Sequence, residues 1–552
     1  MINKIGLQDS TSSSNSNIAR KNKEGNPNFK GVASLAIAGM QACERMPMVN
    51  VAVIDMISAI LPRTIVESLT NWFAGFEAFR RESSGLIVNC MIPSVITLGV
   101  AKILNPAIMP KKTNMSRCWA DRSIINKVTD YYKNTSSEDK IQEVFKNMLG
   151  DIEGFEGKDK LNFKEILGEE SINEYAKKLK DISAKDISNK EMRRQVNEIS
   201  KEIIDKTKIA EHISVGGVKT AAVSSLLEDS VKFFREFQKL GNKISIEEFA
   251  KKSKKLVGTK SLIGLGIVLP LAASMQYINR WITGKVSGTK GAPIYEDFAK
   301  SDDNIEERPK AKEGLLRQKF ISIGSMLGVS LLSMMKMPSM KMLEFKGMFP
   351  TMDQARIIST TTFASRMAAA DDKNELAEAT VRDIATYCGL YFFGDYAAKA
   401  MATLMEKKTG VSLLNDTKPI AKDANILKRF WHWVKDVNIK SSEEVVSKTQ
   451  KALKGKTPTK EEALKIAQEL KHAKYLRGGC QAANLGVSLA LLGLVIPIFT
   501  RKKTKKKHEQ ALKLAQQEQS SNKNEEKEIA VTPLDVKYSS LTAGFRAENK
   551  RK

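Results

Sequence analysis

Ionisable side chains that interrupt apolar stretches are the residues of this chain best placed to do chemistry. Asp55, Arg63, Glu67, Glu77 and Arg81 fall within the largely apolar residues 31–84. A carboxylate or guanidinium inside a membrane marks an ion or substrate pathway in many membrane proteins. Arg63 and Glu67, and likewise Glu77 and Arg81, are also one helical turn apart, so each pair can form a local ion pair. We favour these local pairs over a functional site.

A second pair of charges, Asp395 and Lys399, lies one helical turn apart within the apolar residues 384–404. On an isolated helix, each charge near the centre of a bilayer would cost about 3 kcal/mol. The cost falls where the two charges face other helices. A membrane span and a packed soluble helix are therefore equally compatible with this segment.

Three tryptophans are placed as anchors at a membrane interface. Trp281 lies at the end of the apolar residues 262–282, and Trp431 and Trp433 lie in NILKRFWHWVKDVNIK at 425–440. That stretch puts apolar residues on one helical face and basic residues opposite, the pattern of a helix in the headgroup plane. His432, between the two tryptophans, could act as a proton switch. An aromatic cluster at the interface is the favoured interpretation.

The sequence contains no catalytic, cofactor or metal motif. Nucleotide-binding GxxxxGK[ST] and GxGxxG, the zinc motif HExxH and the nucleophile motif GxSxG are all missing. The five cysteines form no CxxC pair, and the four histidines are far apart. Residues 160–165 and 243–248 end like calcium-binding loops but lack the preceding oxygen ligands, so helix caps explain them. We predict no cofactor and no metal, and we do not expect an enzyme.

Long, mainly apolar stretches predict transmembrane helices. The strongest is 478–500, which has no charged residue, spans the roughly 20 residues needed to cross hydrocarbon and precedes a basic run at 501–507. Further candidate spans are 85–109, 262–282, 318–338 and 384–404. Residues 31–84 carry more charges, and we expect them at the membrane surface or packed against other helices. The total is three to six spans.

The overall composition fits apolar segments joined by long polar connections. The mean hydropathy is −0.29, and 89 Lys and Arg against 63 Asp and Glu give a net charge of +26. This excess favours anionic partners. The lipid bilayer, with anionic headgroups, and an acidic protein are the partners we expect. Nucleic acid fits the charge too, but no motif indicates it.

These features predict an all-α, multi-helix, membrane-associated fold with long basic helical soluble regions. The expected regions are a disordered leader (1–30), an apolar helical region (31–110), a soluble basic helical domain (111–258), a membrane region (259–405), a polar helical region with the tryptophan helix (406–477), the strongest span (478–500) and a basic, mostly disordered tail (501–552).

The favoured function is that of a structural or scaffolding membrane protein whose basic regions contact anionic lipid or acidic partners. A transporter or channel that uses Asp55, Arg63, Asp395 and Lys399 is the first alternative, and a membrane enzyme acting on lipid is the second. The basic residues 501–507 predict a cytoplasmic C-terminus in the plasma (inner) membrane. Residues 406–477 are also basic, however, and flank the last span on its other side.

Overall fold

The computed structural model describes most of the chain between residues 47 and 499. The described ranges are 47–69, 72–118, 121–154, 161–207, 209–287, 314–334, 340–345, 350–371, 373–416, 420–421, 423–446 and 460–499, with Lys502 and Lys506. The expected leader at 1–30 and nearly all of the expected tail at 501–552 lie outside these residues.

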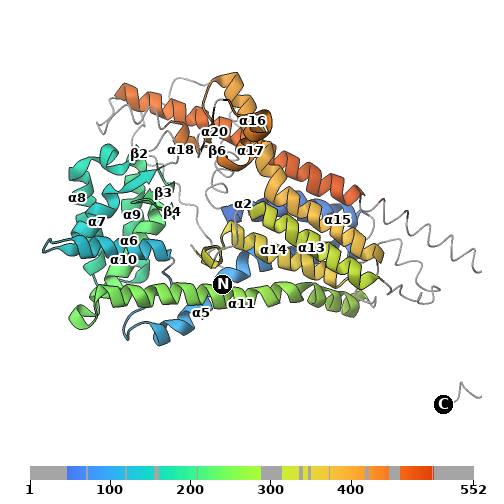
Figure 1. The fold of residues 1–552 in the computed structure, drawn as a ribbon, viewed down its shortest axis with the longest axis horizontal. Helices are drawn as coiled ribbons and strands as arrows, with labels where there is room; N and C mark the ends of the chain where they lie inside the picture. The colour runs from blue at the N-terminus through green and yellow to red at the C-terminus, as the bar shows by residue number, and fades with distance from the viewer. Residues whose placement is uncertain are drawn as a thin grey trace, which may run out of the picture.

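The described chain is almost entirely helical, which confirms the predicted all-α class. Figure 1 shows two parts, a compact group of helices around a small sheet and a bundle of longer helices, with one long helix running beneath both. The compact group is formed by residues 109–258 and is called the domain below. The remaining long helices form the bundle.

The described residues of the domain form five complete helices and one sheet. The helices agree with the predicted helical domain, but the sequence did not predict the sheet. Sheet order is β2-β1-β3-β4, and each neighbouring pair is antiparallel. Its elements are α6 (Arg122–Asn134), α7 (Lys140–Gly150), β1 (Ile152–Gly154), β2 (Leu161–Asn162), α8 (Phe163–Ala184), α9 (Asn189–Thr207), β3 (Glu211–Val215), β4 (Val218–Ala222), α10 (Val223–Gln238) and the 3-10 turn η3 (Gly241–Lys243). Strands β1 and β2, of three and two residues, carry too little periodicity to be recognised in a sequence. Strands β3 and β4 flank Gly216-Gly217, both at positive φ, and this two-residue hairpin signal was missed.

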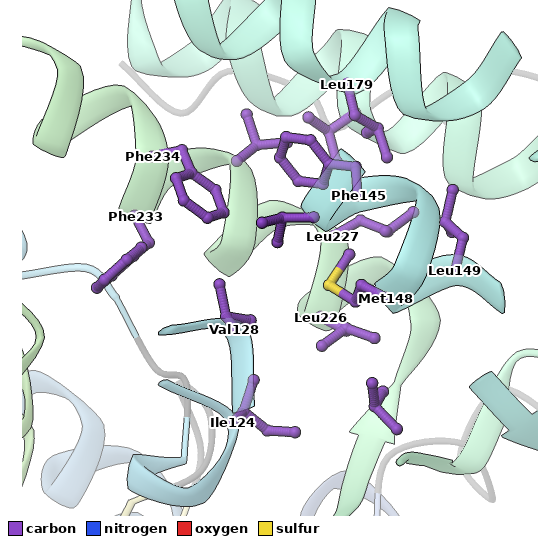
Figure 2. Packing of buried hydrophobic residues seen from close by; sticks show 14 of the residues in the cluster. Ile124, Val128, Phe145, Met148, Leu149, Leu179, Leu226, Leu227, Phe233 and Phe234 are labelled. Carbon is purple, nitrogen blue, oxygen red and sulfur yellow. The ribbon is translucent and has the colours of Figure 1, made fainter. Parts of the chain in front are cut away.

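Hydrophobic spacing and capping residues explain the helices of the domain. Val144, Phe145, Met148 and Leu149 of α7 are fully buried in one core cluster, as their helical spacing predicts (Figure 2). Ser188 and Glu191, and likewise Ser245 and Glu248, have the S-x-x-E spacing of a capping box, which predicts a helix start. Ser188 accepts a hydrogen bond from the backbone of Glu191, and Ser245 accepts one from that of Glu248, so both predicted starts are confirmed. The same S-x-x-E spacing at Ser171 and Glu174 predicts a third helix start; α8 has a kink at Gly168 (φ 74°, ψ 159°), so its second helical segment begins within three residues of Ser171.

The bundle is built from helices that run back and forth along one direction. Several are interrupted by π-helical segments, written η. The elements are α2 (Pro47–Asp55), η1 (Met56–Ile60), α3 (Leu61–Ser68), α4 (Trp72–Leu86), η2 (Ile87–Met91), α5 (Ile92–Ile108), α11 (Ile246–Ser287), α13 (Leu315–Met334), the 3-10 turn η4 (Met340–Leu343), α14 (Met352–Ala368), α15 (Lys373–Cys388), η5 (Gly389–Phe393), α16 (Gly394–Thr409), α20 (Lys460–Ser488) and η6 (Leu489–Val495). Between α16 and α20 lie a two-stranded ribbon, β5 (Leu414–Asp416) with β6 (Val437–Ile439), and the short helices α17 (Ile426–Asp436) and α18 (Ser442–Val445).

Five helices of the described chain are long and apolar enough to cross a membrane. They are Met48–Ser68, Trp72–Ile108, Ile246–Val286, Leu315–Met334 and Leu464–Phe499. Four of them contain the expected spans at 85–109, 262–282, 318–338 and 478–500, except that residues 335–338 and 500 lie outside the described residues. Met48–Ser68 belongs to the region that we expected at the surface. Five such helices fit a membrane protein.

Two of these helices define an uncharged band of the right thickness. Helix α5, with η2 and the end of α4, packs antiparallel to α11: Asn279 donates a 2.8 Å hydrogen bond to Ser84, and Gly264 lies against Thr97. Residues 83–101 and 261–279 are both free of charged side chains. At 1.5 Å per residue, each stretch is about 28 Å long, close to the hydrocarbon thickness of a bilayer.

The segment 384–404 is not among the five apolar helices, yet it is part of the bundle. It runs through α15, η5 and α16, which pack along α20 and η6. Gly389 lies against Leu492, and Gly479 lies against Met405, so the two chains are antiparallel over this length. Of its two charges, Lys399 is half-buried and Asp395 is exposed, and each has a hydrogen-bond partner on another segment, the Val434 carbonyl and Asn484.

Candidate functional site: a polar seam through the helical bundle

Helix α14 of the bundle carries many polar side chains and is nevertheless largely buried. It begins with a complete capping box in which Thr351 and Gln354 bind each other's backbone groups. It packs against α11, α13 and α15. Its buried residues include Ser359, Thr360, Thr362, Ser365 and Arg366. The line of polar side chains along α14, together with their partners on neighbouring helices, is called the polar seam below.

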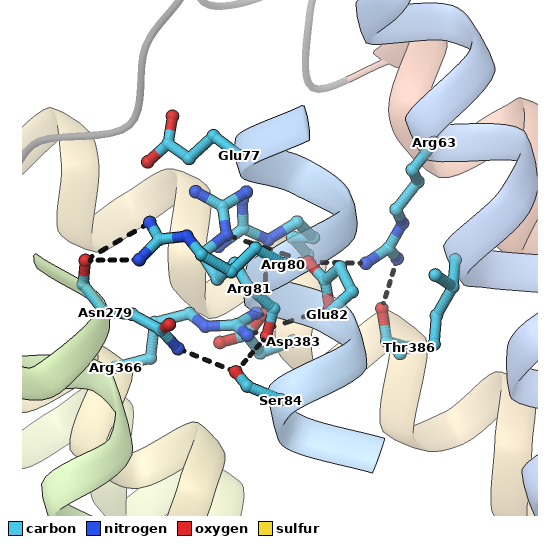
Figure 3. Close-up of polar contacts among 12 residues, drawn as sticks. Arg63, Glu77, Arg80, Arg81, Glu82, Ser84, Asn279, Arg366, Asp383 and Thr386 are labelled. Atoms are coloured by element: carbon cyan, nitrogen blue, oxygen red, sulfur yellow. Dashed lines mark hydrogen bonds and ion pairs between the residues drawn. The ribbon is translucent and has the colours of Figure 1, made fainter. Parts of the chain in front are cut away.

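One end of the polar seam is a buried cluster of arginines and carboxylates, shown in Figure 3. Five of its members form a connected chain, called the distal cluster: Arg63, Glu82, Arg366, Asp383 and Arg382. Glu82 lies 3.3 Å from Arg63 and 3.7 Å from Arg366. Asp383 lies 2.8 Å from Arg366 and 3.2 Å from Arg382. The chain connects α3, α4, α14 and α15.

Further polar contacts attach the distal cluster to its surroundings. Arg63 donates a 2.8 Å hydrogen bond to the Thr386 hydroxyl, and Asp55 lies within electrostatic range of Glu82, Arg63 and Arg366. On the α11 side, Arg80 donates a 2.7 Å hydrogen bond to Thr283, whose hydroxyl also donates to Glu77.

Hydroxyl groups occupy the middle of the polar seam. Ser359 hydrogen-bonds the Tyr391 hydroxyl at 3.0 Å, and Thr362 donates to Asn89 at 3.2 Å. Thr360 donates to Ser330 at 2.8 Å, and Ser330 in turn accepts from Tyr387 at 3.3 Å. These bonds satisfy polar groups that hydrocarbon could not solvate.

All four π-helical segments of the described bundle lie around this middle section. Asn89 belongs to η2, Tyr391 belongs to η5, and η1 packs directly against η6. A π-helical segment is rare and is found frequently at functional sites, because the widened turn releases backbone groups from the regular ladder. Ser58 of η1 is fully buried, and its hydroxyl has no hydrogen-bond partner among the described residues.

The other end of the polar seam lies nearer the domain. The guanidinium of Arg356 is 5.7 Å from the centre of the Tyr391 ring and 3.2 Å from Asp353. Asp395 accepts a 3.4 Å hydrogen bond from Asn484. Lys399 donates a 3.1 Å hydrogen bond to the Val434 carbonyl, near the end of α17.

The geometry assigns the predicted site residues to two separate groups. Asp55, Arg63, Glu77 and Arg81 lie in or beside the distal cluster, and Asp395 and Lys399 lie at the opposite end of the polar seam. The partner of Arg63 is Glu82 on the next helix rather than Glu67 one turn away. Glu67 has an interaction of its own elsewhere.

Sequence reasoning missed Glu82, Arg366, Arg382 and Asp383, which carry most of the distal cluster. One signal was present for Glu82: it immediately precedes the uncharged residues 83–101. The other three contact residues that are distant in sequence: Arg366, for example, pairs with Glu82. No local spacing rule connects such residues.

The paired charges of the distal cluster favour a structural role. Each of its two carboxylates contacts at least two guanidinium groups, so neither is poised as a general base. A buried charge that keeps its ion-pair partners fixes the relative position of the helices on which the charge and its partners lie. The hydroxyl-lined middle section is different, because hydroxyl groups both donate and accept and could serve a passing ion or proton.

Domain and bundle are joined by shared helices and buried polar contacts. Phe249, Leu256 and Val257 of α11 belong to the domain core, whereas Val268 and Ala272 of the same helix belong to a core cluster of the bundle. At the junction, Lys260 donates a 2.5 Å hydrogen bond to the Cys118 carbonyl. Arg122 of α6 pairs with Glu344, and this hydrogen bond raises the pKa of Arg122 above its usual value.

The three predicted anchor tryptophans differ in their surroundings. Trp281 and Trp431 are exposed, with 65% and 59% of their surface accessible. Trp433 instead stacks on Tyr396 of α16, with ring centres 6.1 Å apart, and Lys399 lies over its ring. His432 lies 3.6 Å from Asp436 on the same helix.

Comparison with known proteins does not extend these observations. No protein-family model, curated protein or solved structure matches the chain. The polar seam, the junction and the apolar surface are therefore the features that bear on function.

Proposed function

We propose that this chain is a multi-pass membrane protein with a structural role, which holds the domain at a fixed height and orientation on the membrane surface. The observation that carries the proposal is helix α11. Its 42 residues run without a break from the domain core into the bundle core. An uninterrupted helix of this kind transmits orientation, whereas a flexible linker would not.

Two further features support a rigid scaffold. Helix α5 enters the same junction from the opposite direction: Asn105 accepts a hydrogen bond from the Met115 backbone and donates one to the Thr113 carbonyl, both at 2.8 Å. At the far end of the bundle, the distal cluster ties four helices together. A bundle with both ends fixed suits a protein that positions other molecules.

The distribution of charge favours anionic lipid as one partner of the scaffold. Residues 111–258 hold 30 Lys and Arg against 25 Asp and Glu, so the domain as a whole is only weakly basic. The excess is concentrated where the domain meets the bundle, at Lys111, Lys112, Lys251, Lys252, Lys254 and Lys255. Basic side chains next to a membrane span attract anionic headgroups by about 1 kcal/mol each. An acidic protein bound at the same surface is a second partner of this kind.

The orientation in the membrane follows from one constraint. Helix α20 and η6 end on the side of the bundle away from the domain (Figure 1). A cytoplasmic C-terminus, which the basic run at 501–507 favours, therefore places the domain on the opposite side of the plasma membrane. Thiol labelling in intact cells, with cysteines at Lys201 of the domain and at Lys506, tests this arrangement. Labelling of both positions from the same side would exclude it.

The rigid coupling is tested by distances between spin labels in the full chain. We would place labels at Lys201→Cys in the domain and Leu316→Cys in the bundle, in a Cys43→Ser/Cys388→Ser background and in lipid nanodiscs. The expected distance distribution is as narrow as that of a pair within the bundle, Val95→Cys with Leu316→Cys. A distribution much broader than this internal control would show that the domain moves independently and would remove the proposal.

Transport of a small ion or proton is the second candidate, favoured by the hydroxyl-lined middle of the polar seam and its π-helical surroundings. The two functions differ in whether water reaches Ser359. In a transporter, Ser359→Cys reacts with charged, membrane-impermeant thiol reagents in reconstituted protein; in a scaffold it does not. Lys201→Cys supplies the positive control, and Val95→Cys, exposed in the middle of the uncharged residues 83–101, supplies the lipid-facing negative control.

A further inference from the structure

We infer that α17 is a binding surface for an anionic lipid leaflet, on the side of the membrane that carries the domain. The inference deepens the proposed function, because it rests on the bundle spanning a membrane. Helix α17 has no buried residue. It is also the element most unusual for a soluble surface, because one whole face is apolar.

The apolar face of α17 is large and continuous. Ile426, Leu427, Phe430 and Trp431 are 85%, 77%, 58% and 59% exposed, and their spacing places them on one side of the helix. Leu404 on the adjacent α16 is 61% exposed. Water does not favour four such side chains on one helix face, so a partner is expected to cover them.

The position of α17 identifies that partner as the membrane interface. Trp433 and Val434 hold the helix against Tyr396 and Lys399 of α16. That part of α16 lies beside the first turns of the uncharged residues 478–500, since Gly479 contacts Met405 and Gly394 contacts Asn484. Helix α17 therefore sits at the depth where hydrocarbon gives way to headgroups. An amphipathic helix buries its apolar face about 5–10 Å at this boundary.

The charges on α17 specify the headgroup. Lys428 and Lys435 are exposed and seven residues apart, so they lie on one side of the helix, next to Trp431. Long basic side chains placed there can bury their methylene groups and extend their ammonium groups to phosphate. A leaflet rich in phosphatidylglycerol or another anionic lipid supplies the matching charge.

Hydrogen exchange on the full-length protein tests the inference. The protein would be placed in nanodiscs of phosphatidylcholine alone or with one quarter phosphatidylglycerol, and exchange of the α17 amides would be followed by mass spectrometry. We expect slower exchange in the anionic discs. Because each basic side chain at an anionic surface adds roughly fivefold in affinity, Lys428→Gln/Lys435→Gln should remove most of this difference. Both side chains are exposed, so folding is not at risk.

Controls separate this inference from the proposed function. Lys185→Gln/Lys201→Gln makes the same charge change on the domain and should leave the lipid effect on α17 intact. Residues 262–279 report on membrane embedding in the same experiment. If they are protected while α17 exchanges equally fast in both lipids, or if the Lys428/Lys435 variant keeps the effect, the inference is wrong and the scaffold stands. If residues 262–279 exchange freely, the proposed function falls.

Discussion

At the scale of single residues, the distal cluster shows how a mostly apolar bundle contains many charges. Arg366 lies between the carboxylates of Glu82 and Asp383, and only 6% of its side chain is exposed. Removing one partner from such a set leaves the others buried without compensation, which costs more than an exposed pair contributes. The importance of these residues for stability is therefore expected to exceed that of any surface ion pair.

Asp383→Asn should be strongly destabilising. The substitution keeps the shape of the side chain but leaves Arg366 and Arg382 without their shared carboxylate, at an expected cost of about 3–5 kcal/mol. The measurement is thermal unfolding of the purified protein in detergent. Asp353→Asn is the matched control: its carboxylate pairs with Arg356 one turn away and is 29% exposed, so the change should stay near 0.5 kcal/mol. Equal effects of the two variants would contradict the assignment.

For a buried lysine of the domain, we expect a substitution to stabilise the folded protein rather than to destabilise it. Lys232 of α10 is 4% exposed, and burial lowers the pKa of its ammonium group below the usual value. The charged form is thus less favourable in the folded protein than in the unfolded chain, and the penalty applies at every pH below the ordinary lysine pKa.

Lys232→Met should consequently stabilise the domain by about 1 kcal/mol at neutral pH, with a gain that shrinks as pH rises towards the lysine pKa. Thermal unfolding at pH 7 and at pH 10 measures both effects. Lys243→Met, at an exposed position, should change little at either pH. A loss of stability in the Lys232 variant would show that Asp229 and Glu236 depend on the ammonium group.

At the scale of elements, close contact between helices depends on glycine at a few positions. A Cβ atom at Gly493 of η6 would lie 2.9 Å from the Ser58 carbonyl oxygen and 3.0 Å from the Pro62 ring. The backbone of η6 can therefore approach η1 and α3 only without a side chain there. Gly486, seven residues earlier in the same span, has no such neighbour.

Gly493→Val should separate η6 from η1 and cost about 1–3 kcal/mol, the range for overpacking a buried site. Gly486→Val, on the exposed side of the same helix, should be nearly neutral. Both are compared by thermal unfolding in detergent. If the two valine variants are equally stable, the contact between these spans is looser than the distances indicate.

At the scale of the whole molecule, the five apolar helices and the two uncharged bands of matching length make membrane embedding the central expectation. The full-length protein should remain in the membrane pellet after washing with alkaline carbonate. A peripheral membrane protein in the same sample should be released. Recovery of the chain in the supernatant would remove the membrane placement, and with it both proposed functions.

The sequence alone predicted the features that depend on local composition. Long, mainly apolar stretches at 85–109, 262–282 and 478–500 were recognisable because transfer into hydrocarbon depends on residues that are contiguous in the chain. Apolar spacing likewise predicted α7, and the capping boxes at Ser188 and Ser245 predicted two helix starts. The sequence left open whether residues 31–84 enter the bilayer, because the charges there looked too costly before their partners were known; Met48–Ser68 of this region is one of the five candidate spans.

Only the tertiary structure decided which distant residues meet. Arg63 pairs with Glu82 instead of Glu67, and Arg366 joins Glu82 to Asp383, because α3, α4, α14 and α15 converge at one end of the bundle. The pairing of β1 with β3 is decided in the same way, because it joins segments some 60 residues apart, such as Ile152 and Val215. The pairing of β3 with β4 is local instead, across the turn Gly216-Gly217. Burial and long-range pairing are properties of the packed chain, and a local pattern of residue types contains neither.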